Sequence, residues 1–455
     1  MTGVSASMSR LGAGDRGIPT WLLVAVPTAV AGIANWLWIG RQSLWQDEGF
    51  TAQMVTVPWF QFWDAVTNRD GNMAGYYLLL RLWPFHDDEA GLRSLSALFV
   101  IASVPLVFWI GKELGGRAAG WWAASLFAIW PFIVRYGQEA RSYGLLILVT
   151  VVATAALLKA TRTDRSRWWV AYGLLVGLGL YAHLFAVLNV LPHAVWIVML
   201  RPPRRQVALA AGAAGMVASP MVVYLFFHFG NTGIDWIPRP TLGSLWTDVV
   251  QPMTWYNHFL LAALVLAALV LGASALLRHR DELPRFALLV TWACLPLLVG
   301  LAYSLLVRPV LQAHYVIAII PAWALLLGVA IAKIRARVVS VAAGVVVLAV
   351  CARSLLGYYA EFIKPEIRDA AALVASQTQP GDAVVEENGM QPALDYYWRN
   401  VQRPTAGTTG RRLWVVHSWD PAPPQTVAAD WRLVWRQDLY HVSVALYEPA
   451  SEARK

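Results

Sequence analysis

The chain has 455 residues, of which 58% are apolar and only 14% are charged. A soluble domain carries about 25% charged residues, so this chain cannot cover the surfaces of several soluble globules. Aromatic residues reach 12%, which excludes a disordered chain. The net charge of +9 does not indicate a nucleic-acid partner, because the basic residues lie in short clusters between long apolar runs. The composition predicts a multi-pass membrane protein.

Apolar runs long enough to cross a bilayer recur along most of the chain. A spanning helix needs about 20 mostly apolar residues, and the sequence predicts about eleven such helices. The first is expected to be an uncleaved anchor, because no small-residue cleavage site follows it. The predicted spans are 19–40, 90–112, 117–134, 141–158, 168–182, 184–200, 207–229, 258–277, 285–306, 313–332 and 338–357.

Basic clusters occupy every second connection between these spans. Such clusters mark the cytoplasmic side of a membrane. With an odd number of spans, the N-terminus is predicted to be cytoplasmic and the C-terminal region extracytoplasmic, with the plasma membrane as the location. The clusters are Arg10 and Arg16, Lys112 and Arg117, Lys159 to Arg167, Arg201 to Arg205, Arg278 and Arg280, and Lys333 to Arg337.

The first connection on the predicted outer side, residues 41–89, is long and acidic. Its segment 53–66 is aromatic and interrupted by Pro58, so we expect one or two short amphipathic helices along the membrane surface. Segment 76–83 predicts another interfacial helix.

After about residue 358 the composition changes to that of a small soluble α/β domain. We therefore divide the chain into a membrane domain, 1–357, and an extracytoplasmic domain, 358–455. The elements expected in the second domain are a helix at 365–379, a turn at 380–382, strands at 383–387 and 413–419, and a strand pair at 431–449.

The most informative residues follow the first span and read Trp45-Gln46-Asp47-Glu48-Gly49. Two carboxylates at a membrane surface are costly unless they are solvated or paired. One interpretation is that Asp47 caps the next helix while Glu48 is solvated. The other is that one of them is a catalytic base. Adjacent side chains point in different directions, so the two cannot form the facing carboxylate pair of a glycosidase.

A second polar group lies in the outer connection that contains Arg135, Gln138, Glu139, Arg141 and Tyr143. On a helix, their spacings of three and four residues would give adjacent polar stripes. Two arginines outside run against the positive-inside bias. They indicate either an ion pair that fixes a helical hairpin or a phosphate site, because arginine presents a planar fork to phosphate oxygens.

A third group lies at the outer ends of later spans and comprises His183, Arg308 and His314. A histidine in such a place is most often an interfacial hydrogen-bonding residue, whereas Arg308 is another basic residue on the outer side. The sequence contains no Walker loop, dinucleotide fingerprint, metalloprotease motif or close cluster of His and Cys.

Taken in chain order, four motifs resemble those of bacterial glycosyltransferase family 39-like proteins, which are relatives of the protein O-mannosyltransferases and the lipid A aminoarabinose transferases. The motifs are Trp45 with Asp47-Glu48-Gly49, Leu92-Arg93-Ser94-Leu95-Ser96-Ala97, Tyr136-Gly137-Gln138-Glu139-Ala140-Arg141-Ser142-Tyr143, and Tyr181-Ala182-His183. The resemblance is strongest over about residues 40–200. It implies a GT-C fold, an all-α polytopic membrane domain, here followed by the small C-terminal α/β domain.

The resemblance also implies an activity, the transfer of a sugar such as mannose or arabinofuranose from a polyprenyl-phosphate donor. The acceptor would be a glycan, lipid or protein outside the membrane, and a single displacement would invert the anomeric carbon. Asp47 would be the catalytic base and Glu48 a supporting residue. The residues expected to bind substrate are Arg93, Arg135, Gln138, Glu139, Arg141, Tyr143, His183, Arg308 and His314.

The resemblance implies no cofactor, although a divalent cation at Asp47 and Glu48 stays open. The alternative function is that of a transporter or lipid flippase with the same charged cavity. Transporters are commonly built from two halves of matching hydropathy, and this chain shows none.

Overall fold

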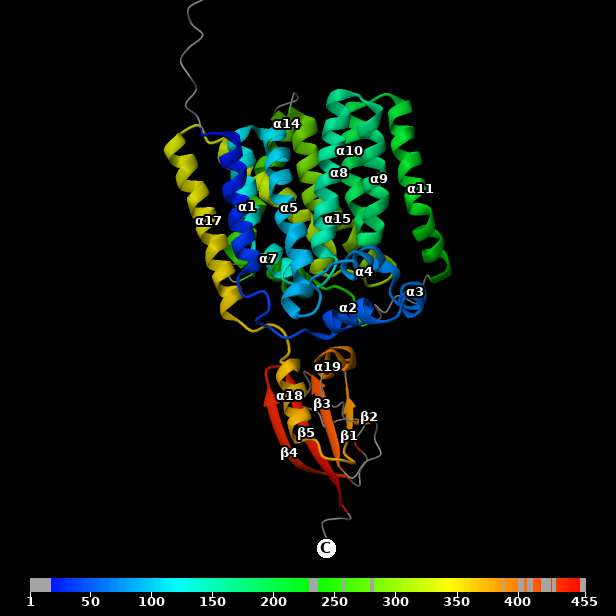
Figure 1. Cartoon of the computed structure of the whole chain (residues 1–455). Helices are drawn as coiled ribbons and strands as arrows, with labels where there is room; N and C mark the ends of the chain where they lie inside the picture. Colours follow the sequence, from blue (N-terminus) through cyan, green and yellow to red (C-terminus); the bar gives the residue numbers. More distant parts are fainter. Residues whose placement is uncertain are drawn as a thin grey trace, which may run out of the picture.

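The computed structural model describes residues 18–228, 236–255, 258–278, 282–387, 389–399, 405–406, 412–418, 427 and 431–450. Two parts follow one another along the chain: a bundle of long helices and a small α/β domain (Figure 1). The bundle ends with α17 at Ala360, and the α/β domain begins with α18 at Ile367. This break lies close to the predicted boundary between residues 357 and 358.

The bundle consists of long apolar helices that run roughly side by side (Figure 1). Each of the eleven predicted spans is mostly helical, and one of them, 117–134, is broken into α6 and α7 with a bend of 56°. The helices are α1 (Thr20–Trp36), α5 (Glu89–Gly115), α6 (Arg117–Ala128), α7 (Pro131–Gly137), α8 (Tyr143–Thr163), α9 (Ser166–Ala182), α10 (Val190–Leu200), α11 (Arg204–His228), α14 (His258–Arg278), α15 (Leu283–Leu306), α16 (Ile320–Ala332) and α17 (Arg337–Ala360).

Length and composition decide which of these helices can cross a membrane alone. Within the described residues, six are long and apolar enough, or up to eight if each bent pair is one span. Two further segments, Thr20–Trp36 and Leu184–Leu200, are apolar but shorter. Because the long helices are apolar and lie side by side, the chain is a multi-pass membrane protein.

The bundle core and the bundle surface are both apolar, as expected in lipid. The core lies mainly between α5, α6, α8 and α16. Large apolar side chains on α11 and α17, such as Phe226 and Val338, stay exposed and suit contact with lipid tails.

Short helices cap the bundle end that faces the α/β domain (Figure 1). In the long connection after α1 they confirm the predicted short helices, because Pro58 separates α2 from α3 and α4 overlaps most of the predicted segment 76–83. The short elements are α2 (Gln46–Thr56), α3 (Trp59–Asn68), η1 (Gly71–Met73), α4 (Ala74–Arg81), η2 (Leu184–Asn189), α12 (Leu242–Leu245), η3 (Trp246–Val250), α13 (Gln251–Thr254) and η6 (Ala313–Ile319).

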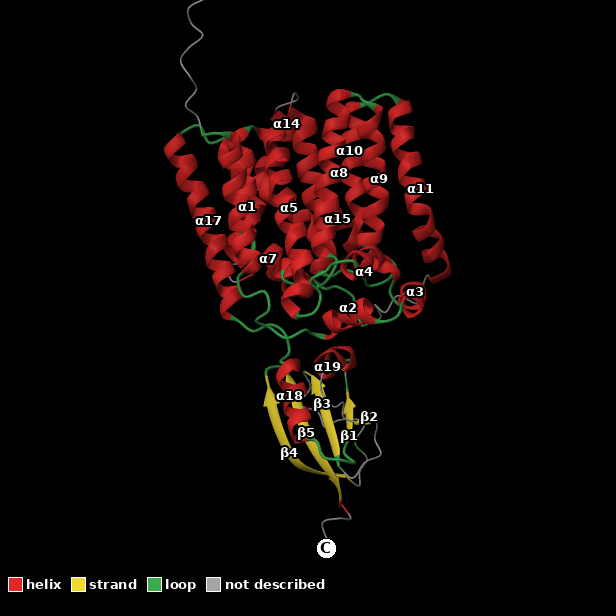
Figure 2. Ribbon diagram, viewed as in Figure 1, coloured by secondary structure: helices red, strands yellow, loops and turns green. Residues whose placement is uncertain are grey.

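The C-terminal domain is a mixed sheet covered on one face by two helices (Figure 2). The strand order is β2-β1-β3-β5-β4; β1 pairs in parallel with β2 and β3, while β5 runs antiparallel to β3 and β4. The elements are α18 (Ile367–Gln377), β1 (Ala383–Glu386), α19 (Gln391–Trp398), β2 (Thr405–Ala406), β3 (Leu413–Ser418), β4 (Trp431–Leu439) and β5 (Val442–Pro449). The sequence missed only α19 and β2 among these.

A buried ion pair stabilises the turn before β1. Asp382 accepts hydrogen bonds from Arg412 Nε at 2.9 Å and from Trp414 Nε1 at 3.0 Å. It thereby fastens the turn at 380–382 to the start of β3, which lies beside β1 in the sheet.

Candidate active site

The acidic pair lies in the first turn of α2, between the bundle and the C-terminal domain (Figure 1). Carboxylates are favoured there because the first turn of a helix carries unpaired backbone N–H groups. Adjacent helical residues point about 100° apart, so the two side chains enter different surroundings. The Asp47 side chain is 38% exposed, whereas Glu48 is fully buried.

Glu48 is bound by groups from three other segments. Its Oε1 accepts hydrogen bonds from Arg93 Nε at 2.7 Å and from the Ala140 backbone N–H at 2.9 Å. Its Oε2 accepts from a second Arg93 nitrogen and from Lys364 Nζ, both at 2.8 Å. Burial raises the pKa of Glu48, but the charges and hydrogen bonds of Arg93 and Lys364 outweigh it and hold the pKa at about 2. Glu48 is therefore ionised and joins these segments.

Arg93 uses its whole guanidinium within the protein. Besides Glu48, it donates to the backbone carbonyls of Ile39, Gln42 and Ser43 at 2.8 to 2.9 Å. A guanidinium has five N–H groups, and these contacts with Glu48 and the carbonyls occupy all five. The prediction that Arg93 binds substrate does not fit this geometry, since Arg93 instead holds the connection after α1 against Glu48.

Residues 135–143 join two helices, as predicted, so the polar stripes that one continuous helix would give are not formed. α7 ends at Gly137, the chain turns through Gln138 to Ser142, and α8 begins at Tyr143. α7 packs too closely on α1 for a larger residue, because a Cβ at Gly137 would clash with the Asn35 side chain. The break replaces helical spacing with a loop, whose Ala140 N–H is bound by Glu48.

Gln138 fastens this loop to α1 and α17. Its amide nitrogen donates to the backbone carbonyls of Ala34, Asn35 and Leu37, and its amide oxygen accepts from the Tyr358 hydroxyl at 2.9 Å. These contacts give Gln138 a structural task, and its predicted contact with a substrate stays a prediction.

Arg141, in this loop, lies next to Asp47 of α2. One guanidinium nitrogen lies 3.5 Å from Asp47 Oδ2, and another donates to the Tyr77 hydroxyl at 3.2 Å. Tyr77 in turn donates to Asp70 Oδ2 at 2.6 Å. The Arg141 side chain is 12% exposed. Arg141 thus lies between Asp47 and Tyr77, and Tyr77 extends this chain of polar contacts to Asp70 at one end of the bundle.

Several buried polar atoms beside this pair make no hydrogen bond within the described part of the chain. Such atoms are rare in folded proteins because each one costs free energy. They are Trp45 Nε1, Arg135 Nε, Glu139 Oε1, Arg141 Nε and Ser142 Oγ. They belong to Trp45, two residues before Asp47, and to the segment 135–142 that carries Arg141, and such atoms are available to bind a polar ligand.

Aromatic and imidazole rings form a cluster around the same loop. Tyr143 lies 6.0 Å from His183 and 5.1 Å from His314 between ring centroids, and His183 lies 5.0 Å from Tyr315. Asn72 holds this arrangement, because its side chain accepts from the Leu184 N–H and contacts His183 Nε2. The structure therefore brings the predicted residues Tyr143, His183 and His314 together.

Two predicted arginines have different surroundings. Arg135 lies over the rings of Tyr136 and Trp255, 5.2 and 5.1 Å from their centroids. Arg308 lies in the segment between α15 and η6, and its contact with a substrate stays a prediction. Arg135 is thus ordered beside the loop that carries Arg141.

Comparison with known proteins bears on the fold. A sequence model of the dolichyl-phosphate-mannose-protein mannosyltransferases matches residues 72–228. No curated protein sequence matches the chain. ArnT from Cupriavidus metallidurans in the apo state superposes with a TM-score of 0.63 at 16% identity, over 94% of this chain and 97% of ArnT. ArnT bound to undecaprenyl phosphate gives a TM-score of 0.58 at 15% identity, over 94% and 98% of the two chains.

The Archaeoglobus fulgidus oligosaccharyltransferase in the apo form gives a TM-score of 0.54 at 11% identity, over 83% of this chain and 63% of that enzyme. The protein has the GT-C fold. Identities this low show the fold alone, so the chemistry of this GT-C protein has to be argued from its own residues.

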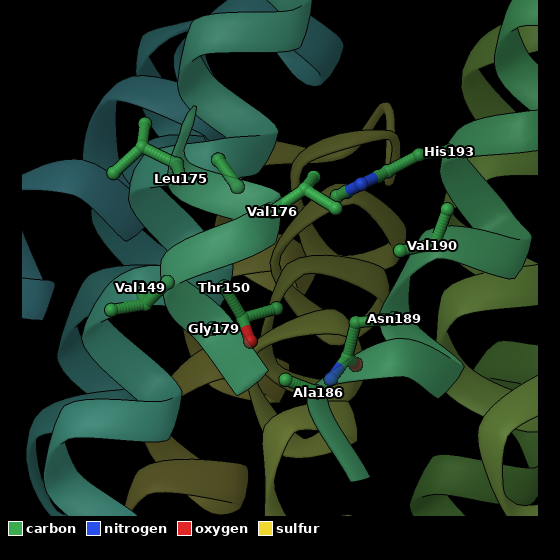
Figure 3. Close-up of a pocket in the computed structure, with 10 residues that line it drawn as sticks. Val149, Thr150, Leu175, Val176, Gly179, Ala186, Asn189, Val190 and His193 are labelled. Carbon is green, nitrogen blue, oxygen red and sulfur yellow. The ribbon is translucent and has the colours of Figure 1, made fainter. Parts of the chain in front are cut away.

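A small cavity lies elsewhere in the described part of the GT-C bundle (Figure 3). It is enclosed by α8, α9, η2 and α10, with Thr150, Asn189 and His193 as its polar lining, and its volume is about 20 Å³. A cavity needs about 10–15 Å³ to hold one water, so this one has room for little more than that. It is too small to be a donor site.

The described residues contain no group of three or more His, Cys, Asp or Glu side chains arranged to hold a metal ion. Whether a divalent cation binds at Asp47 stays open. Sequence reasoning missed three members of the site, Asp70, Tyr77 and Lys364. No local pattern marks them, and Lys364 lies 316 residues from Glu48 in the chain.

Proposed function

We propose that this GT-C protein is a membrane glycosyltransferase that moves a sugar from a polyprenyl-phosphate donor to an acceptor hydroxyl. The observation that carries the proposal is the approach of Asp47 and Arg141 to 3.5 Å at the membrane-surface end of the bundle. A sugar transfer that releases a phosphate needs a base for the acceptor and a cation for the leaving group. This pair supplies both beside apolar helices that a lipid donor can approach.

The solved structures of the same fold support a lipid-phosphate donor. ArnT binds undecaprenyl phosphate, and the archaeal oligosaccharyltransferase AglB has been solved with a dolichol-phosphate. The matched sequence model is named for enzymes that use dolichyl-phosphate-mannose. AftD, an arabinofuranosyltransferase from mycobacteria, gives a TM-score of 0.54 at 15% identity, over 95% of this chain and 42% of AftD. Mannose and arabinofuranose are both therefore reasonable sugars to test.

The proposed reaction is one displacement. The acceptor oxygen attacks the anomeric carbon and forms the new glycosidic bond, while the bond from that carbon to the phosphate oxygen breaks. The electron pair of the broken bond stays on the phosphate, and the acceptor proton passes to Asp47. Attack from the face opposite the phosphate inverts the anomeric carbon.

Arg141 fits the phosphate because its guanidinium offers a planar fork and its Nε makes no hydrogen bond within the described residues. Arg141 also lies close to Asp47. A donor phosphate would compete for Arg141 and so release Asp47 to act as a base. Arg135, on the same loop side, would add a second positive charge. This exchange of partners links donor binding to activation of the base.

We also propose that the site faces the outside of the plasma membrane. α10 and α11 are joined, and α17 begins, at the bundle end away from the C-terminal domain (Figure 1). These connections hold the basic clusters that mark a cytoplasmic face. Alkaline phosphatase, which is active only outside the cytoplasm, should be active when fused after Pro449 and silent when fused after Asp164. The reverse pattern would place the site inside.

The deciding experiment is a transfer assay on membranes with a panel of labelled polyprenyl-phosphate sugars. We expect label to move from one donor to an acceptor fraction. Arg141→Lys keeps the charge but loses the fork, so transfer should fall on the order of 10²-fold. Arg69→Lys, at an exposed position outside the site, is the matched control and should keep full activity.

A transporter or flippase would carry the intact donor across the membrane without breaking the bond to the phosphate. Movement of intact donor into the opposite leaflet, with no labelled acceptor for any sugar in the panel, would reject the transferase proposal. Full transfer in Arg141→Lys would reject the role assigned to the guanidinium fork.

A further inference from the structure

Lys364 connects the C-terminal domain to the site. It lies in the connection 361–366, between the last membrane helix and α18. Its side chain is only 7% exposed, which is unusual for lysine. Its Nζ donates to Glu48 Oε2 at 2.8 Å and lies 3.9 Å from Glu139 Oε2. One ammonium from the connection therefore faces two carboxylates of the membrane domain.

Both carboxylates are next to the residues proposed to react. Glu48 follows Asp47 in α2, and its Oε1 binds the N–H of Ala140, which precedes Arg141. Glu139 lies in the same loop, two residues before Arg141. Any movement of Lys364 is thus transmitted to both members of the Asp47–Arg141 pair through at most two residues.

The connection is bound to the membrane domain, and the C-terminal domain docks beside it. The backbone N–H groups of Ile363 and Lys364 both donate to Gln42 Oε1, at 2.9 and 3.0 Å. Arg368, in α18, pairs with Glu89 at 2.8 Å. α19 packs on α2 so closely that a Cβ at Gly49 would clash with the backbone of α19. The domain is therefore fixed directly against the helix that carries Asp47.

Charge makes Lys364 necessary for this arrangement. The charged groups that act on Glu48 are Arg93 and Lys364, and those that act on Glu139 are Lys364, Arg135, Glu48 and Asp47. The phenols of Tyr76 and Tyr358 lie beside both carboxylates. Lys364 is therefore the cation that acts on both. Without it, Glu48 would keep only Arg93 and Glu139 would keep only Arg135, which disfavours the charged forms of both carboxylates.

We propose that Lys364 is a positioning residue for the transfer reaction, through which the docked C-terminal domain orders Asp47 and Arg141. This inference rests on the proposed function for its catalytic consequence. The link itself rests on the contacts of Lys364 with Glu48 and Glu139. The C-terminal domain would thereby take part in ordering the site at the membrane surface.

The test compares three variants of the full-length protein in membranes. Lys364→Met keeps the aliphatic stem and removes the charge, whereas Lys364→Arg keeps the charge. Arg368→Met weakens domain docking without touching Glu48 and is the matched control. For each variant, we would measure kcat and KM for transfer, the pH profile of kcat/KM, and amide hydrogen exchange over residues 138–142.

We expect Lys364→Met to lower kcat on the order of 10²-fold, because a displacement of about 1 Å in a reacting group costs that much. The acid limb of its pH profile should move to higher pH, since the carboxylates lose a cation. Exchange at Ala140 should quicken, because its N–H depends on Glu48. Lys364→Arg should recover most of the activity, and Arg368→Met should leave the pH profile unchanged.

Two results would overturn the inference. One is full kcat and unchanged exchange in Lys364→Met. The other is an equal loss and an equal pH shift in Arg368→Met, which would assign the effect to docking alone. If the wild type transfers no sugar from any donor while exchange still quickens in Lys364→Met, the proposed function fails and the link between the domain and the loop stands.

Discussion

Neutralising Glu48 should destabilise the protein, whereas neutralising Asp47 should abolish its reaction and leave its stability intact. Glu48→Gln leaves Arg93 and Lys364 buried without their counter-charge. Removing one partner of a buried pair costs about 3–5 kcal/mol. The pKa of Glu48, lowered from 4.5 to about 2, leads independently to about 3 kcal/mol, because each unit is worth about 1.4 kcal/mol.

The pH dependence of this stabilisation has a defined sign. The pKa of Glu48 is lower in the folded protein than its ordinary value, so the stabilisation is fully present above about pH 4.5. It is lost as the pH falls from there towards 2. In Glu48→Gln this part of the acid sensitivity should disappear, because glutamine does not titrate.

Asp47→Asn should behave differently, since the Asp47 side chain is 38% exposed and its nearest cation is 3.5 Å away. Asp47 is the more exposed partner of this pair, so its neutralisation should cost much less stability than that of the fully buried Glu48. Transfer should fall by about 10²–10⁴-fold, the usual contribution of a positioned base. Asp64→Asn, at an exposed position on α3, is the matched control.

The assay is thermal unfolding of each purified variant in detergent at pH 7, together with the transfer rate per folded molecule. We expect a clearly lower unfolding temperature only in Glu48→Gln. Equal unfolding temperatures in Glu48→Gln and the wild type would refute the assignment of Glu48 as the buried anchor. Unchanged transfer in Asp47→Asn would remove Asp47 from the role of base.

Two further outcomes are expected. Tyr77→Phe removes the hydroxyl that contacts Arg141, so donor affinity should weaken by about 10-fold, measured as KM, with little change in kcat. Although burial raises the pKa of Asp382, its bonds to Arg412, Gln379 and Trp414 lower that pKa below its ordinary value. Asp382→Asn should therefore destabilise the C-terminal domain by about 1–3 kcal/mol at pH 7, and urea unfolding should show this difference shrinking as the pH falls below about 4.

The membrane helices were predictable because each is encoded locally. A run of apolar residues and the basic residues after it suffice to predict a span and its direction. The surface helices around Pro58 and the strands of the C-terminal domain follow from local patterns in the same way. The connection between α7 and α8 agrees with the one predicted between the spans 117–134 and 141–158, whereas its close approach to α1 at Gly137 was not predictable. Propensity alone cannot report a contact between helices distant in sequence.

The site was predictable only where its residues form short motifs. Asp47, Arg141 and His183 each belong to such a motif, and the structure places Asp47 and Arg141 together. The structural role of Arg93 was not predictable, because its five donors are used by carbonyls and a carboxylate that sequence cannot assign to it. Lys364 was missed because a lone lysine after a span carries no pattern of its own. The role of Lys364 depends on its contact with Glu48, which lies 316 residues earlier in the chain.

The distance between Glu48 and Lys364 along the chain has a consequence for biosynthesis. Partners 316 residues apart are made at different times, and the ribosome completes α2, α5 and the loop 138–142 long before it reaches Lys364. During that interval Glu48 lacks the second of its two cations. The contacts around Glu48 are therefore completed only after α17 is made and the α/β domain that follows it docks. Under the proposed function, the order of synthesis delays sugar transfer until Lys364 is in place.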